Sequence, residues 1–324
     1  MNETTIGVDV SKDWLDAHRW PDGASGRFAN DRQGHKALIR WIGSAPVARV
    51  VFEPTGPYHR GLARSLAEAG LPAAAVNPWQ ARRFAEGAPW SAIGPSDMAT
   101  GRRAKTDPID AAPLARLGAL LEPETRAPAS PAIEALRELR LARAALLRDR
   151  TAARNREPHL TLALLKRQNR ARLAAIDREL RAVDAAIAAV IAEDENLARA
   201  AAILVSIPGI SAVTAAAVPA EMPELGSLAP GAAASLGGLA PITRRSGKWQ
   251  GRAAIRGGRA GLRRALYMAA LTASGFNPDL KAVHDRLLAA GKARKLALVA
   301  VMRKLLLLAN ALLRDGRTWC PNAP

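Results

Sequence analysis

The feature that most constrains the fold is a change of pattern near residue 130. Before that point short apolar runs alternate with amphipathic runs, whereas 131–196 consists mainly of Ala, Leu, Arg and Glu with almost no aromatic side chains. Strands that alternate with helices are typical of a mixed α/β sheet, and apolar residues at spacings of three and four are typical of long helices. We therefore expect an α/β domain over 1–128, followed by helical regions.

The first 80 residues carry the pattern of such a sheet. Residues 4–10 read TTIGVDV, in which apolar side chains alternate with Gly7 and Asp9, as in a half-buried strand. Further strands are predicted at 14–20, 49–54 and 71–78. The intervening helices are predicted after an N-cap at Asn30 or Asp31, and over 58–70.

Residues 82–104 are rich in Gly, Pro and Ser, so we expect a long loop there. The next helix is expected to begin at Asp107, because Pro108 then takes the first helical position, where its missing N–H matters least. That helix start would carry two carboxylates three residues apart, Asp107 and Asp110.

The segment 131–196 predicts two long helices, divided by Pro158. A helical hairpin or a coiled coil would follow, and it could carry oligomerisation. The alternative is a solvated helical spacer.

The last third of the chain predicts a helix-hairpin-helix. Residues 203–218 read ILVSIPGISAVTAAAV, two apolar helical runs joined by a Pro208-Gly209 turn. Such a turn, with Gly209 at its centre, can present backbone N–H groups to a phosphate, although many helix pairs join through similar turns. A segment dense in Gly and Arg follows at 238–264, and the chain then ends in helices.

The charge indicates a polyanionic partner. Lys and Arg number 47 against 29 Asp and Glu, which gives a formal net charge of +18. Nucleic acid or an anionic membrane would bind such a protein, while compositional drift in a GC-rich genome is the alternative explanation. Candidate nucleic-acid contacts in the basic segment are Arg244, Arg245, Lys248, Arg252 and Arg256.

Several classes of protein are excluded. The single cysteine, Cys320, allows no disulfide framework and no Cys/His zinc site. The first residues lack the basic and apolar regions of a secretory signal, and Arg303 and Lys304 interrupt the most apolar stretch, so we expect an amphipathic helix there and no membrane span. A cytoplasmic protein is expected.

Four carboxylates stand out by their positions. Asp9 lies within a strand, Glu53 ends another strand, and Asp107 and Asp110 begin a helix, so the four could converge at one edge of the sheet. Helix capping, the helix dipole or an arginine partner could explain the last three, whereas Asp9 is poorly placed unless it is paired or ligating. Oxygen ligands without a Cys or His cluster suit Mg²⁺ or Mn²⁺, and two such ions stabilise phosphodiester chemistry.

Ser246 is a candidate nucleophile. It lies in RRSGKWQGR, between arginines that could hold a phosphate, and a serine oxygen can form a covalent phosphoester. No histidine is near it in the sequence, so a metal or a carboxylate would have to activate it. A Ser-Gly pair in a polar segment is otherwise usually a turn.

The motifs, in order, resemble a known family. GVDVSK, FEPTG, KTDPIDA, SIPGIS, GLAPITRRSG and LRRALYMAA occur in this order along nearly the whole chain. The set is similar to that of the DEDD transposases of one insertion-sequence group, described as bridge-RNA-guided recombinases.

The resemblance implies three domains: a RuvC-like RNase H domain over 1–128, a helical coiled-coil region over 129–197, and a transposase domain over 198–324. It assigns the Mg²⁺-binding tetrad to Asp9, Glu53, Asp107 and Asp110, and the nucleophile that attacks DNA to Ser246. It also implies a homo-oligomer, a dimer or tetramer, whose active site is shared between protomers. A structured noncoding RNA would pair with target and donor DNA, so that base pairing supplies the specificity.

Two other functions remain open at this point. A RuvC-like junction nuclease would use the acids and water without the serine, and a non-catalytic nucleic-acid-binding protein would use neither. Only the recombinase requires both the acids and Ser246.

Overall fold

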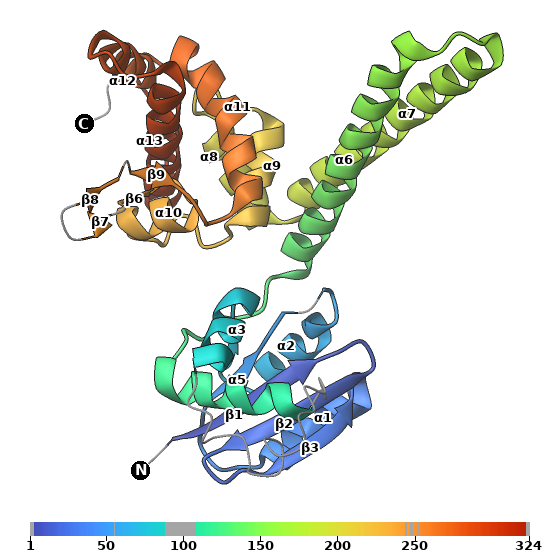
Figure 1. Cartoon of the computed structure of the whole chain (residues 1–324), viewed down its shortest axis with the longest axis vertical. Coiled ribbons are helices and arrows are strands. Elements are labelled where there is room, and N and C mark those ends of the chain that lie inside the picture. Colours follow the sequence, from blue (N-terminus) through green and yellow to red (C-terminus); the bar gives the residue numbers. More distant parts are fainter. Residues whose placement is uncertain are drawn as a thin grey trace. The chain divides into compact units, whose positions relative to one another are not determined.

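The computed structural model describes residues 3–54, 56–87, 108–243, 245–246, 249–251 and 253–321, with the backbone alone at 86–87, 108–110, 245–246 and 249–250. The chain divides into two compact units, 1–128 and 129–324, which Figure 1 shows coloured along the sequence. The first boundary lies where the sequence pattern changes, and the helices that follow it belong to the second unit.

The first unit is built on one five-stranded sheet. Its strands are β1 (Thr4–Val10), β2 (Trp14–Trp20), β3 (Ser25–Ala29), β4 (Val47–Phe52) and β5 (Ala73–Ala75). They lie in the order β3-β2-β1-β4-β5, in which β1 to β3 are antiparallel neighbours and β4 and β5 run parallel to β1. The predicted mixed α/β domain is confirmed, and this topology is consistent with the RNase H-like fold that the resemblance implies.

Helices cover both faces of the sheet. They are α1 (Arg32–Ile42), α2 (His59–Glu68), α3 (Pro78–Gly87) and α5 (Pro108–Leu121). Helices α1 and α2 pack on the face that carries Ile6, Val8 and Val10. Helices α3 and α5 pack on the other face, against Val51 and Ala74. Strand alternation therefore directs Gly7 and Asp9 to the face that α5 covers.

Gly7 sets how closely α5 approaches the sheet. A Cβ atom at this position would overlap the carbonyl oxygen of Ala111 and the amide nitrogen of Ala115, so the helix backbone rests directly on β1. Only glycine permits this contact between backbones at position 7. At Gly118, further along α5, an added Cβ would overlap the side chains of Thr5 and Val51.

Two local predictions were wrong or incomplete. Residues 82–87 were expected in a loop, but they complete α3, whose start is stabilised by the Asn77 side chain accepting from Trp79 N at 2.9 Å. Ala81 and Phe84 on this helix join the apolar core, which explains why it forms. Strand β3 was not predicted, because Ser25 and Gly26 look like turn residues and the strand exists only through its pairing with β2.

The second unit is helical. Its helices are α6 (Pro131–Arg156), η2 (Glu157–His159), α7 (Ala163–Glu193), α8 (Glu195–Val205), α9 (Ala212–Glu221), α10 (Pro230–Leu236), α11 (Ala260–Phe276), α12 (Pro278–Ala289) and α13 (Arg294–Asp315). Ser211 caps α9 by accepting from Thr214 N, and Asp194 caps α8 in the same manner. The two helices around Pro208-Gly209 form as the sequence predicted.

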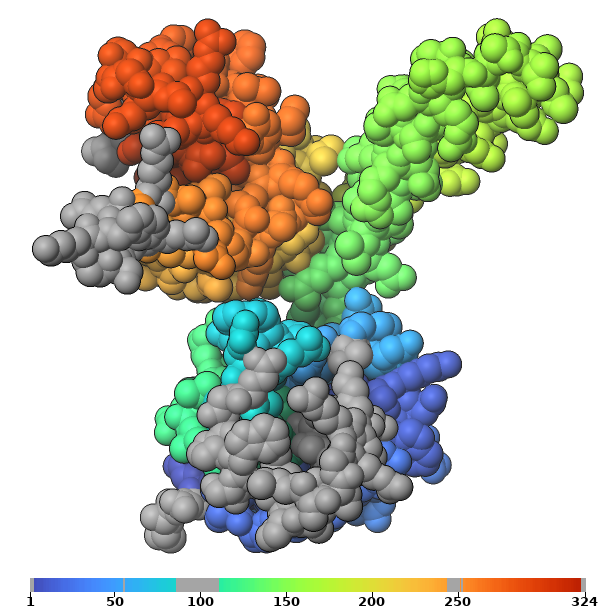
Figure 2. All heavy atoms as spheres, in the orientation of Figure 1, coloured from blue at the N-terminus to red at the C-terminus, as the bar shows by residue number. Residues whose placement is uncertain are grey.

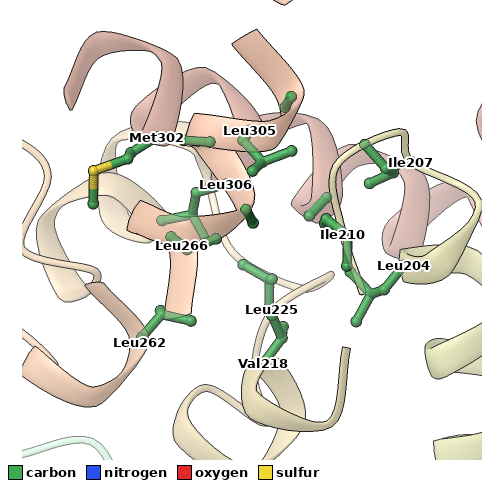
Figure 3. Packing of buried hydrophobic residues seen from close by; sticks show 14 of the residues in the cluster. Leu204, Ile207, Ile210, Val218, Leu225, Leu262, Leu266, Met302, Leu305 and Leu306 are labelled. Atoms are coloured by element: carbon green, nitrogen blue, oxygen red, sulfur yellow. The ribbon is translucent and has the colours of Figure 1, made fainter. Parts of the chain in front are cut away.

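Helix α13 lies at the centre of the core of this unit. By length and composition it could cross a membrane, but half of its most apolar window is buried among the other helices. Met302, Leu305 and Leu306 belong to one apolar cluster with Leu262 and Leu266 of α11, and Figure 3 shows Leu306 beside Leu266. Helix α13 therefore has one side in the core while Lys304 is exposed, which is the amphipathic helix that the sequence predicted.

Helices α6 and α7 form the predicted hairpin, and the short η2 helix that contains Pro158 separates them. On α7, Asn169, Ile176, Leu180 and Ile187 are buried, at spacings that keep them on one side of the helix. The hairpin is rooted where Ile133 and Leu136 pack with residues of α7 and α9. Figure 2 shows it projecting, in green to yellow-green, from the other helices of the unit.

The Gly7 contact leads to a stability prediction. Gly7→Ala should lower the free energy of unfolding by about 1–3 kcal/mol, because the added methyl group overlaps helix backbone that cannot rotate away. Gly275→Ala in α11 is the matched control, because nothing lies within 4 Å of its added methyl group. Denaturant unfolding of the full chain measures both variants, and an unchanged transition in Gly7→Ala would contradict the contact.

Candidate active site

Asp9 and Glu53 lie side by side at one edge of the sheet. Strands β1 and β4 pair in parallel up to Val8 and Phe52, and the two acids are the next residues along the chain, with Glu53 just past the end of β4. Neighbouring strands are about 4.8 Å apart, so the two Cα atoms are close neighbours. Both acids are partly buried, and alternation directs both side chains to the face that α5 covers.

The first turn of α5 lies at the same edge. Gly118 contacts Thr5, and Ala111 and Ala115 contact Gly7, so α5 runs opposite to β1 and its start lies toward Asp9. Asp110 belongs to this first turn, although only its backbone is described. The structure therefore brings three of the four predicted acids to one edge.

Asp107, the fourth acid, lies outside the described residues. Among the side chains that the structure describes, no three Asp, Glu, His or Cys residues form a group suited to a metal ion. The residues at this edge nevertheless fit a divalent cation, because Asp9 and Glu53 supply oxygen donors from adjacent strands and the α5 start adds a third acid. Carboxylate donors of this kind are those that Mg²⁺ and Mn²⁺ prefer.

A further acid, Asp16, was missed by the sequence analysis. It lies directly opposite Asp9 in the β1–β2 register and is buried. Arg27 on β3 donates to both Asp16 oxygens, at 2.7 and 2.8 Å, and so neutralises a carboxylate that would otherwise repel Asp9. The signal was present in the sequence, because a tight turn between 4–10 and 14–20 pairs these two positions.

Asn30 braces the loops that follow the two acid-bearing strands. Its Nδ2 donates to Ser11 O at 2.7 Å, after β1, and to Tyr58 O at 3.2 Å, after β4. Its Oδ1 accepts from His35 Nε2 at 2.9 Å, so His35 Nδ1 is left to accept from Ser65 at 3.1 Å. Burial lowers the pKa of His35, and Asp31 opposes that shift, so the net effect favours the neutral ring.

Ser246 lies in the segment between α10 and α11, residues 237–259, here called the Ser246 excursion. The outer ladder pairs β6 (Pro241–Ile242) with β9 (Ala254–Ile255), and the inner ladder pairs β7 (Arg245–Ser246) with β8 (Trp249–Gln250). Ser246 is the last residue of β7, and its backbone pairs with Trp249 of β8. Its side chain is not described.

Two glycines bring the two ends of this excursion into contact, at a place here called its neck. Gly238 and Gly258 both have positive φ, and a Cβ atom at Gly258 would overlap the backbone of Gly238. Arg259 N donates to Leu236 O at 3.0 Å across the same neck. The glycine density of 238–264 is therefore explained in part by this contact between backbones.

Arg259 anchors the neck to the end of α9. Its guanidinium donates to Glu221 O at 2.6 Å and to both carboxylate oxygens of Glu224, one of them at 2.9 Å. From α6, Arg137 and Arg140 donate to Ala220 O and Ala217 O at 2.7 and 3.0 Å. Three arginines thus bind the last carbonyl groups of one helix, where cations are favourable.

The predicted phosphate contacts are only partly described. Gly209 has φ of 106°, and an added Cβ would lie 2.6 Å from Ala273 Cβ, so packing against α11 already requires glycine there. Arg256 is exposed just after β9, and Arg245 is in β7. The other candidates, Arg244, Lys248 and Arg252, lie outside the described residues.

Comparison with known proteins points to transposases. Residues 6–162 match the model of DEDD transposases, described as "Transposase", and 201–285 match one described as "Transposase IS116/IS110/IS902 family". The first range contains all four predicted acids, and the second contains Gly209 and Ser246. Together the two models cover most of the chain in the expected order.

Relatives of known designation agree. Pilin gene-inverting proteins of Moraxella bovis and Moraxella lacunata are each 28% identical to the chain, over 98% of both sequences. A Streptomyces coelicolor protein, "Insertion element IS110 uncharacterized 43.6 kDa protein", is 34% identical over 47% of this chain and 37% of its own length.

The Asn30–His35 brace predicts a pH dependence. Because the pKa of His35 is lowered in the folded protein, the unfolded chain binds the proton first, and stability is lost as the pH falls below about 6.5. His35→Gln should flatten that loss in thermal unfolding between pH 7.5 and 5. His18, whose pKa burial also lowers, should leave a residual slope in the variant. An identical slope in both proteins would exclude His35 as its source.

The Arg259 anchor predicts a local effect on the Ser246 excursion. Arg259→Ala should cost about 1–3 kcal/mol, because the Glu224 carboxylate, whose side chain is 17% exposed, loses its hydrogen bonds from this guanidinium. It should also speed amide hydrogen exchange across 241–255. Arg256→Ala, which removes an exposed arginine of the same segment, is the control. Unchanged exchange in Arg259→Ala would show that the neck holds without the anchor.

Proposed function

We propose that this chain, whose residues 6–162 and 201–285 match models of DEDD and IS116/IS110/IS902 transposases, is the site-specific recombinase of an insertion sequence. In this proposal a structured noncoding RNA guides it, and it acts through a covalent link to Ser246. The family and the gene-inverting relatives make it an enzyme that cleaves and rejoins DNA. The observation that carries the proposal is the placement of Asp9 and Glu53 on adjacent parallel strands, with the start of α5 at the same edge.

The acids have the role of holding divalent metal. Asp9 and Glu53, with Asp107 and Asp110, would bind Mg²⁺ or Mn²⁺, which neutralises charge on the reacting phosphate when bound. Asp16 stays paired with Arg27, so this fifth carboxylate adds no uncompensated charge beside the metal ligands. Asn30 keeps the two strand-end loops in register around the ligands.

Ser246 has the role of nucleophile. Its Oγ loses a proton and forms a bond to phosphorus, while the P–O bond to the departing deoxyribose oxygen breaks and that oxygen takes up a proton. Attack by a deoxyribose hydroxyl of the partner strand on the same phosphorus reverses the step and releases serine. The bond energy is conserved in the link, so rejoining needs no further energy source.

The remaining parts of the proposal concern partners. Target and donor duplexes and the guide RNA are the polyanions that a net charge of +18 favours. The acids and Ser246 belong to different compact units, which is compatible with an active site shared between the protomers of a dimer or tetramer. A cytoplasmic protein that works at the chromosome is part of the same proposal.

The decisive experiment replaces the serine. Ser246→Ala should abolish recombination between donor and target plasmids in the presence of the flanking noncoding RNA, and it should remove the DNA-linked protein band on a denaturing gel. Asp9→Asn should abolish both as well, because the metal ligand is lost. Ser235→Ala, an exposed serine of α10, should retain wild-type activity.

Each outcome separates the possible functions. Full recombination by Ser246→Ala would remove the serine from the mechanism. Metal-dependent cleavage that needs Asp9 but survives the loss of Ser246 would identify a hydrolytic junction nuclease. Cleavage that survives both changes would leave the acids with a structural role only.

A further inference from the structure

The far half of the α6–α7 hairpin concentrates positive charge. Residues 148–172 contain eight Lys and Arg against two Asp and Glu, a net charge of +6. The rest of the hairpin, 131–147 and 173–196, contains five basic and eight acidic residues, a net charge of −3. The asymmetry within one continuous element marks the segment 148–172, here called the hairpin tip, as a distinct surface.

Ion pairs account for only part of this charge. Arg150 pairs with Asp177 at 3.3 Å, and Arg170 lies 3.8 Å from Glu157. Six further basic side chains of the tip are exposed and form no ion pair with any residue that the structure describes. They are Arg148, Arg154, Arg156, Lys166, Arg167 and Arg172.

The tip is presented on a fixed support. Asn169 is buried between the two helices and donates to Ala153 O at 3.1 Å, which pins their register near the tip. Nearer the root, Arg143 pairs with Asp184 at 2.6 Å. Helix α6 has 26 residues, about 39 Å at 1.5 Å per residue, so the tip lies far from the root on α9. Figures 1 and 2 show this half of the hairpin standing apart from the other helices of its unit.

The composition of the tip selects the kind of polyanion. Residues 148–172 contain no Phe, Tyr or Trp, so they lack the aromatic platforms on which the unpaired bases of single strands and RNA loops commonly stack. Arginines on helices of fixed register suit the regularly spaced phosphates of a duplex. We propose that the hairpin tip binds the phosphate backbone of duplex DNA. The proposal rests on the DNA substrate of the family, and it requires neither Ser246 nor the metal ligands.

A pair of double variants tests this surface. Arg154→Gln with Arg156→Gln removes two charges from the tip, and Arg178→Gln with Arg181→Gln removes two exposed charges from the acidic half of α7. Binding is measured by fluorescence anisotropy of the full chain on labelled duplex DNA without divalent metal. Near 0.1 M salt the tip variant should bind at least about tenfold more weakly than wild type. The plot of log K against log salt should become less steep, by up to about 2 in the magnitude of its slope, because each lost phosphate contact lowers that magnitude by about 0.9. The control variant should match wild type.

Other results would overturn the proposal. Unchanged duplex affinity and slope in the tip variant would exclude the contact. A larger loss on the structured RNA or on single-stranded DNA than on duplex DNA would assign the tip to those ligands. The tip also exposes Leu162, Leu164 and Leu165. If the tip variant had a changed mass by light scattering but an unchanged affinity for DNA, the tip would be an interface between copies of the chain instead.

The DNA affinity of the Ser246→Ala variant distinguishes this inference from the proposed function. That variant should bind duplex DNA with wild-type affinity even though it cannot recombine. Circular dichroism and thermal unfolding should be the same for both double variants, since all four substituted side chains are exposed.

Discussion

The contact of the α5 backbone with Gly7 is the constraint on which the first unit depends. Because no side chain separates helix from strand, α5 lies low across β1, and its first turn is brought to the edge where β1 and β4 end. The strand ends that carry Asp9 and Glu53 share this edge with the backbone of the first turn of α5 only if that approach is kept. A larger residue at position 7 would raise the helix and move its first turn away from the two strand ends.

In the second unit, too, a close contact between backbones at glycine sets the position of a segment. Gly238 and Gly258 touch at the neck of the Ser246 excursion, and the charges of Arg259 and Glu224 hold the neck on the end of α9. The α6 arginines bind the same helix end, so the root of the long hairpin and the root of the serine segment share one support. Close contacts between backbones set the position of the segment, and the largely buried Arg259–Glu224 pair holds it there.

Periodicity was sufficient to predict the parts of the fold that follow from local pattern. The strands at 4–10 and 14–20, the break at Pro158 and the helices around Gly209 all formed, because the spacing or the proline that predicts each of them lies within the segment itself. Strand β3 was missed because its stability comes from its neighbour, and the helix over 82–87 because its apolar residues are sparse. Asp16 was overlooked because its significance depends on register with Asp9, a relation between strands. Its arginine partner is likewise set by pairing with β3, which sequence spacing alone does not encode.

The closed neck of the serine segment has a consequence for how such a chain can diverge. Its two ends are held together by glycine contacts and the Leu236–Arg259 hydrogen bond, whatever lies between them. The entropy of closing a loop grows only slowly with length, by about 0.6 kcal/mol for each doubling. Insertions beyond β6 and β9 would therefore affect the helical core little, provided that Leu239 and Ile255, which pack in that core, are kept. The outer part of the segment can change in length while the helices that hold its two ends stay the same.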